Sequence, residues 1–63
     1  MKTSTGREIE VTPNYKEFTF DIKVDDSTTY RTTPMSEDEF KENEFNTAND
    51  WNNFLKSDDY YKL

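Results

Sequence analysis

The segment from Met35 to Leu55 reads MSEDEFKENEFNTANDWNNFL, and it decides the fold because two helix-start signals follow one another within it. At the first signal, Ser36 is a favourable N-cap, since its hydroxyl can accept from a free backbone N–H of the first turn, and Glu39 can complete a capping box. Met35 and Phe40 then occupy the two positions of a hydrophobic staple. These features together predict a helix that begins directly after Ser36.

A second helix start lies further along the same segment. Thr47 as N-cap and Asp50 three residues later repeat the first pattern, and Asn46 just before them weakens helix continuity. The apolar residues that follow share one helix face and must be buried: Trp51, Phe54 and Leu55. The sequence therefore predicts a helical region over residues 36–56, formed either by one bent helix or by two short helices that meet near residues 45–47.

Residues 7–33 show the alternation of apolar and polar residues that is typical of β-strands. Residues 17–25, EFTFDIKVD, are the clearest strand, and their apolar positions fall on one face: Phe18, Phe20, Ile22 and Val24. Residues 7–12 and 28–33 have strand composition on either side of it. Because one face of each strand is polar, the pattern predicts an antiparallel sheet that is covered on one side only.

The turns and the chain ends complete this prediction. Pro13 and Asn14 are favoured turn residues and predict the first turn of the sheet. Residues 1–6, MKTSTG, are small and polar and are expected to be loose. Residues 59–63, DYYKL, are either a fourth, edge strand or a docked tail, and their composition favours the strand. The predicted fold is thus a single α+β domain: three antiparallel strands, with a fourth at residues 59–63, under a one-sided helical layer.

The composition indicates a small domain whose core depends on the packing of aromatic side chains. The chain has 63 residues, no cysteine and only 30% apolar residues, but Trp, Tyr and Phe number 1, 4 and 5. Buried aromatic rings remove much surface from water, yet a chain of this size lies near the lower limit for folding alone. A homodimer would add buried area without lengthening the chain.

The chemistry needed for catalysis is missing. Histidine and cysteine are absent, so the usual general base, the thiol nucleophile and the soft metal ligands are absent too. One glycine cannot form a glycine-rich phosphate loop. Asp25, Asp26 and Ser27 suggest calcium, but they lack the glycine and glutamate of an EF-hand, so a hairpin turn is favoured. We therefore expect no enzymatic activity, no cofactor and no metal.

The negative charge is concentrated in the helical half of the chain. The net charge is −6, and the acids of this half follow one another closely: Glu37, Asp38, Glu39, Glu42, Glu44, Asp50, Asp58 and Asp59. Such a surface disfavours nucleic acid and anionic membranes and favours a basic or groove-bearing protein partner, unless it serves only to solvate the helix. The candidate partner-binding residues are Glu37, Asp38, Glu39, Glu42 and Glu44, with Trp51, Tyr60 and Tyr61 as aromatic anchors.

The segment PMSEDEFKENEFNTANDWNNFLKSDDYYKL, with the preceding TTYRTT, resembles short proteins encoded by bacteriophages of low-GC bacteria. This resemblance implies a stoichiometric inhibitor of a host defence or nucleic-acid-handling protein, as anti-CRISPR and other anti-defence proteins are. It transfers no site residues, because it carries no catalytic motif. The chain has no apolar stretch of membrane-spanning length and no signal-peptide pattern, so we expect it in the host bacterial cytoplasm.

Two hypotheses from different classes follow from the sequence. The first is a non-enzymatic acidic binding protein that docks on a host protein and blocks it. The alternative is a structural or assembly protein that acts by homo-oligomerisation through the exposed sheet edge and residues 60–63, with no role for the acidic residues in binding.

Overall fold

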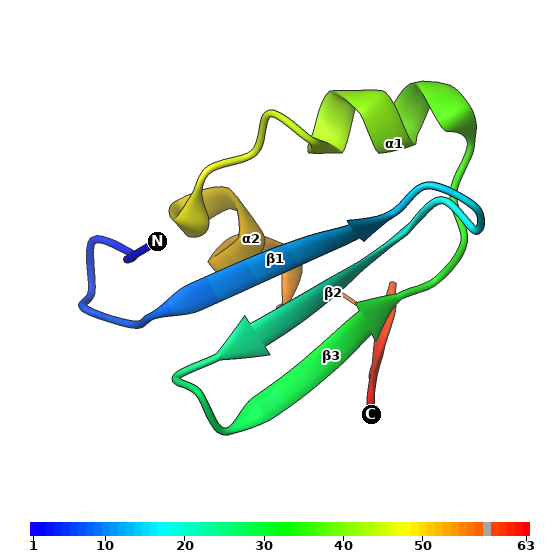
Figure 1. The fold of residues 1–63 in the computed structure, drawn as a ribbon. Helices are drawn as coiled ribbons and strands as arrows, with labels where there is room; N and C mark the ends of the chain where they lie inside the picture. Colours follow the sequence, from blue (N-terminus) through cyan, green and yellow to red (C-terminus); the bar gives the residue numbers. More distant parts are fainter. Residues whose placement is uncertain (58) are drawn as a thin grey trace.

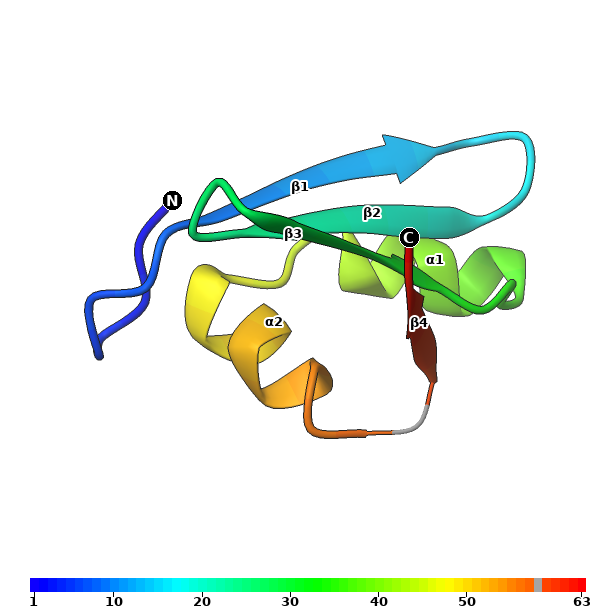
Figure 2. The same ribbon diagram turned by 90° about the horizontal axis from the view of Figure 1, so that it is seen from below.

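The computed structural model describes residues 1–57 and 59–63, and it shows a four-stranded antiparallel sheet with two short helices. The elements follow one another as β1 (Ile9–Asn14), β2 (Thr19–Val24), β3 (Thr28–Thr32), α1 (Glu37–Asn43), α2 (Ala48–Phe54) and β4 (Tyr60–Lys62). The strand order is β1-β2-β3-β4, so neighbours in the sequence are neighbours in the sheet. Both helices lie on one face of the sheet (Figures 1 and 2). The predicted α+β class is confirmed.

The core lies between the sheet and the two helices. Its members come from β1, β2 and both helices: Ile9, Phe20, Ile22, Val24, Phe40, Ala48 and Trp51. The alternation predicted for β2 is present, because Phe20, Ile22 and Val24 are all buried toward the helices. Aromatic rings meet at its centre, where Phe20 lies 4.5 Å from Phe40 and 4.9 Å from Trp51, between ring centroids.

The first turn of the sheet lies later than predicted. Pro13 and Asn14 belong to β1, opposite Phe20 and Thr19, and the turn covers residues 15–18. The expectation of a turn at Pro13 was wrong because β1 is an edge strand, where the missing N–H of proline breaks no bond to the neighbouring strand. Asn14 still shapes the turn, since its Oδ1 accepts from the backbone N–H groups of Lys16 and Glu17.

The N-terminal residues are held against β1, which corrects the expectation that residues 1–6 are loose. The Met1 carbonyl accepts from the Ile9 N–H at 2.7 Å, and Lys2 forms an antiparallel bridge with Glu8. Thr3 is buried, and its hydroxyl accepts from the backbone N–H of Arg7. The short polar side chains of residues 1–6 therefore help to close a turn against β1, and the segment does not extend freely into solvent.

Both predicted helix starts are confirmed, and the two-helix alternative is the one observed. Ser36 accepts from the backbone N–H of Glu39 at 3.2 Å, at the start of α1. At the start of α2, the Asp50 carboxylate accepts from the backbone N–H of Thr47 at 3.0 Å and from its hydroxyl at 2.9 Å. Each helix has seven residues, and neither is long and apolar enough to cross a membrane; this statement covers the described residues.

The fourth strand is also present. β4 pairs with β3 through Thr32 opposite Tyr60 and Arg31 opposite Tyr61. The Tyr60 hydroxyl donates to the backbone carbonyl of Leu55, and its ring packs edge-on against Tyr30 at 5.2 Å between centroids. The C-terminal residues are thus fixed both to the sheet and to the end of the helical layer.

Candidate binding surface

The acidic residues of α1 are exposed, but they do not share one face of the helix. Phe40 is the only buried residue of α1, and it fixes which side faces the sheet. At about 100° per residue, Asp38 and Glu42 project on the side away from Phe40. Glu37 and Glu44 fall on one flank of the helix, and Glu39 falls on the other. All five carboxylates belong to exposed residues.

Two of these carboxylates already have partners within the protein. Glu37 forms an ion pair with Lys41 one turn later, at 3.3 Å. Glu44 accepts from the Tyr15 hydroxyl at 3.3 Å. The negative charge of Glu44 beside this phenol, together with partial burial, raises the pKa of Tyr15 above its usual value, because the phenolate would be repelled. These two acids are therefore less available to a partner than the other three.

The remaining three carboxylates are free to meet a partner. Among the described residues, the side chains of Asp38, Glu39 and Glu42 take part in no hydrogen bond and no ion pair. Asp38 and Glu42 are one helical turn apart, which places their Cβ atoms about 5–6 Å from each other. They form a pair of outward-facing negative charges on a rigid support.

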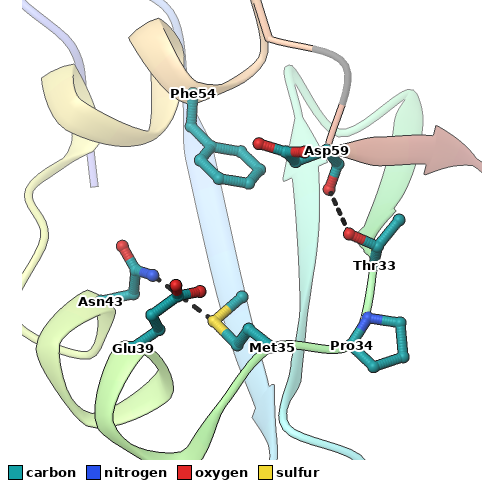
Figure 3. A pocket seen from close by; sticks show the side chains of 7 residues that line it. All are labelled: Thr33, Pro34, Met35, Glu39, Asn43, Phe54 and Asp59. Atoms are coloured by element: carbon teal, nitrogen blue, oxygen red, sulfur yellow. Dashed lines mark hydrogen bonds between the residues drawn. The ribbon is translucent and has the colours of Figure 1, made fainter.

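Glu39 borders a pocket of about 300 Å³ on the other flank of α1. The pocket is lined by residues from four parts of the chain: Thr33, Pro34, Met35, Glu39, Asn43, Phe54 and Asp59. Figure 3 shows Phe54 and Asp59 on one side of the pocket, and Glu39 and Met35 on the opposite side. The lining of this pocket thus includes two acids, Glu39 and Asp59, that are twenty positions apart in the sequence.

The other polar groups of this pocket are hydrogen-bonded within the protein. The Asn43 side chain donates to the sulfur of Met35 at 3.4 Å and accepts from the Asn46 amide at 2.8 Å. The Thr33 hydroxyl donates to the backbone carbonyl of Asp59 at 3.4 Å. Among the described residues, neither the Glu39 nor the Asp59 carboxylate has such a partner. The charge of the pocket is accordingly negative and uncompensated.

Trp51 is not at the surface, which corrects its place among the aromatic anchors. Its side chain is 1% exposed and contacts the rings of Phe20 and Phe54. The face shared by Trp51 and its helical neighbours was predicted to be buried, and burial in the core excludes contact with a partner in this conformation. Trp51 therefore stabilises the fold that presents α1.

Tyr60 and Tyr61 lie on opposite faces of the sheet, because adjacent residues of a strand alternate. Tyr60 is half-buried on the helix side, against Tyr30 and Leu55. Tyr61 is on the open face, opposite Arg31 in β3, and is exposed. The structure thus does not join Tyr61 to the acidic surface of α1, which lies on the other side of the sheet (Figure 2).

Two exposed residues, Asp59 and Phe45, were not among the sequence predictions of binding residues. Asp59 was counted only as part of the acidic run, and its place in the pocket depends on the pairing of β4. Asp58, its neighbour in that run, lies outside the described residues. Phe45 follows α1 and is 87% exposed, the largest exposed fraction among the big apolar side chains. Its position in the gap between two helix signals was the only sequence cue.

Comparison with known proteins adds no assignment. No protein-family model matches the chain, and no curated protein or solved structure shows significant similarity to it. Among the described residues, no group of three or more acidic side chains is arranged to hold a metal ion. The chemistry that remains on α1 is that of charge: fixed carboxylates that can pair with cations on another molecule.

Proposed function

We propose that this protein is a small non-enzymatic binding protein of the phage type, which docks the acidic surface of α1 on a basic groove of a host protein and blocks it. The host protein would be a defence or nucleic-acid-handling protein of the bacterial cytoplasm. The observation that supports this proposal is the pair of outward-facing carboxylates, Asp38 and Glu42, on a helix that Phe40 anchors to the core.

The exposed negative charge of α1 predicts how strongly binding should depend on salt. Exposed carboxylates on a fixed helix resemble a short run of backbone phosphates, which a basic groove attracts. Most of the attraction acts across water, so it speeds association and is weakened by salt. The partner should therefore carry a cluster of arginine or lysine residues, and the complex should dissociate as the salt concentration rises.

The test compares two variants with the same change in net charge. Asp38→Asn/Glu42→Gln removes the outward pair of α1, whereas Glu10→Gln/Glu17→Gln removes two exposed acids outside the helices, one in β1 and one in the turn that follows it. Each tagged protein is used to capture partners from a bacterial lysate at low and at high salt, with circular dichroism as the check of folding. We expect one basic protein to be captured by the wild type and the control variant, and to be lost with the α1 variant.

Two further results decide the proposal. The captured protein should lose its activity on titration with one equivalent of the wild type, and keep it with the α1 variant. If both variants capture the protein equally well, net charge rather than α1 governs binding, and the proposed docking surface is wrong.

A second candidate function, assembly through the sheet, is favoured by the free edge of β4. Among the described residues, this strand pairs only with β3, and Tyr61 within it and Leu63 directly after it are 48% and 56% exposed. An unpaired strand edge with exposed apolar side chains is a template for pairing with a second copy. Sedimentation should then show a defined oligomer that Tyr61→Ser dissociates; a monomer at all concentrations would exclude this function.

A further inference from the structure

We propose that the pocket between α1, α2 and β4 binds an arginine side chain of the partner protein. This inference rests on the proposed function, because it names the residue type by which a basic partner would be held. It differs from that function in its surface: the outward pair Asp38 and Glu42 attracts the partner, whereas the pocket receives one side chain of it.

The pocket has both an apolar part and a charged part. Met35 and Phe54 are half-buried members of the layer that packs against the core, and Pro34 adds an apolar edge. Glu39 and Asp59 supply the charge from opposite sides of the space (Figure 3). An arginine combines the same two properties, since its aliphatic stem packs on apolar surface while its guanidinium meets carboxylates.

The two carboxylates are unused by the fold itself. Glu37 and Glu44, on the other flank of α1, are satisfied by Lys41 and Tyr15. Glu39 and Asp59 take part in no hydrogen bond or ion pair through their side chains within residues 1–57 and 59–63. A cation placed between them would be the first partner of both carboxylates among the described residues.

The side chain of Phe54 favours arginine over lysine. Its ring lines the same side of the pocket as Asp59 (Figure 3). A guanidinium is planar, can stack on an aromatic ring and is less strongly hydrated than an ammonium group, so it loses less on leaving water. A divalent cation is disfavoured, because calcium takes six to eight oxygen ligands and the pocket offers two carboxylates.

The experiment titrates the ¹⁵N-labelled protein with Nα-acetyl-arginine amide and follows the backbone amide resonances. We expect shifts confined to residues around the pocket, namely 33–43, 54–57 and 59–60. Nα-acetyl-citrulline amide, a neutral analogue of nearly the same shape, should cause none, and Nα-acetyl-lysine amide should bind more weakly. Glu39→Gln/Asp59→Asn should weaken arginine binding by about tenfold, from the loss of two ion pairs. Glu10→Gln/Glu17→Gln, which has the same net charge and alters neither the pocket nor the outward pair of α1, should leave it unchanged.

The results that would overturn the inference are distinct from those that test α1. Equal shifts with citrulline, or arginine binding that survives Glu39→Gln/Asp59→Asn, would show that the pocket does not recognise the guanidinium. That outcome leaves the proposed function standing if Asp38→Asn/Glu42→Gln still abolishes capture of the host protein. Conversely, specific arginine binding in the pocket together with unchanged capture by that α1 variant would uphold the pocket and refute the α1 docking surface.

Discussion

The substitution of Phe40 by alanine tests whether one aromatic side chain holds α1 on the sheet. Phe40 is 1% exposed and is the only buried residue of its helix. Its ring lies 4.5 Å from that of Phe20, 5.4 Å from Tyr15 and 5.5 Å from Phe18, between centroids. Deleting a buried phenylalanine side chain costs about 3–5 kcal/mol, because a cavity remains where the ring was.

Phe45 provides the matched control, since the same substitution five positions away removes a side chain that is 87% exposed. For Phe45→Ala we expect a change of no more than about 0.5 kcal/mol. A domain of 63 residues has a total stability of about 3–9 kcal/mol at 0.05–0.15 kcal/mol per residue. Phe40→Ala should therefore lose about a third or more of this stability and, at the lower end of the range, unfold the protein, whereas Phe45→Ala should unfold at the urea concentration of the wild type.

Urea denaturation measures both variants, with Trp51 fluorescence as the probe of the core and circular dichroism as the probe of the helices. Because Phe40→Ala can be unfolded without urea, Phe40→Leu supplies a measurable intermediate. It keeps an apolar side chain but loses the aromatic pairs, at a cost of about 1–3 kcal/mol. A Phe40→Leu variant as stable as the wild type, or a Phe45→Ala variant as unstable as Phe40→Ala, would refute the role given to Phe40.

Two further predictions concern buried hydroxyls and the capping carboxylate. Thr32→Val should destabilise the protein by about 1–3 kcal/mol, because the buried N–H of Phe20 loses the hydroxyl that accepts from it at 2.9 Å. Thr19→Val removes a buried hydroxyl that has no hydrogen-bond partner, so it should not destabilise the protein. Thermal unfolding of the two variants makes the comparison. Hydrogen bonds from the N–H and hydroxyl of Thr47 lower the pKa of Asp50, so this carboxylate contributes stability at neutral pH that is lost as the pH falls through its folded-state pKa. Asp50→Asn should lower stability at about pH 7, and urea titrations should show the difference from the wild type shrinking as the pH falls below the ordinary aspartate pKa of about 3.9.

Local signals predicted the elements of this fold well. The two N-caps were visible because capping depends on residues within one turn of each other, and Ser36 and Thr47 both mark the observed starts. The alternation in β2 was visible because one of its faces is buried and the other is polar. Each of these signals is complete within about eight residues, so no knowledge of the remaining chain was needed.

The errors arose where the role of a residue depends on distant parts of the chain. Pro13 is a turn signal by itself, but its place on an edge strand allows the strand to continue past it. Thr3 gave no sign of burial, because its burial follows from the bridge between Lys2 and Glu8. A tryptophan such as Trp51 is suited equally to anchoring a binding site and to filling a core, and only the three-dimensional packing decides between these two roles.

The candidate site was predicted by residue type but not by arrangement. The acidic run was correctly seen as exposed at the α1 positions, yet its division among three sides of the helix follows from the rotation that burial of Phe40 imposes. That rotation leaves Asp38 and Glu42 facing outward and turns Glu39 toward the pocket. The spacing of residues in the sequence predicts a helix, but only its packing on the sheet decides which side of that helix faces the core and which faces solvent.

The register of β4 completes the pocket. Tyr60 is opposite Thr32, and this pairing places its ring against Tyr30 on the helix side and its hydroxyl at the end of α2. The residue before it, Asp59, is bonded through its carbonyl to the backbone N–H of Thr33 at 2.9 Å, which holds it at the pocket. A slip of one residue would exchange the two tyrosines between the faces of the sheet and shift Asp59 along its edge. The C-terminal strand therefore forms the free edge of the sheet and also holds Asp59, the second carboxylate of the proposed arginine pocket. The pocket can bind arginine only when β4 is paired with β3.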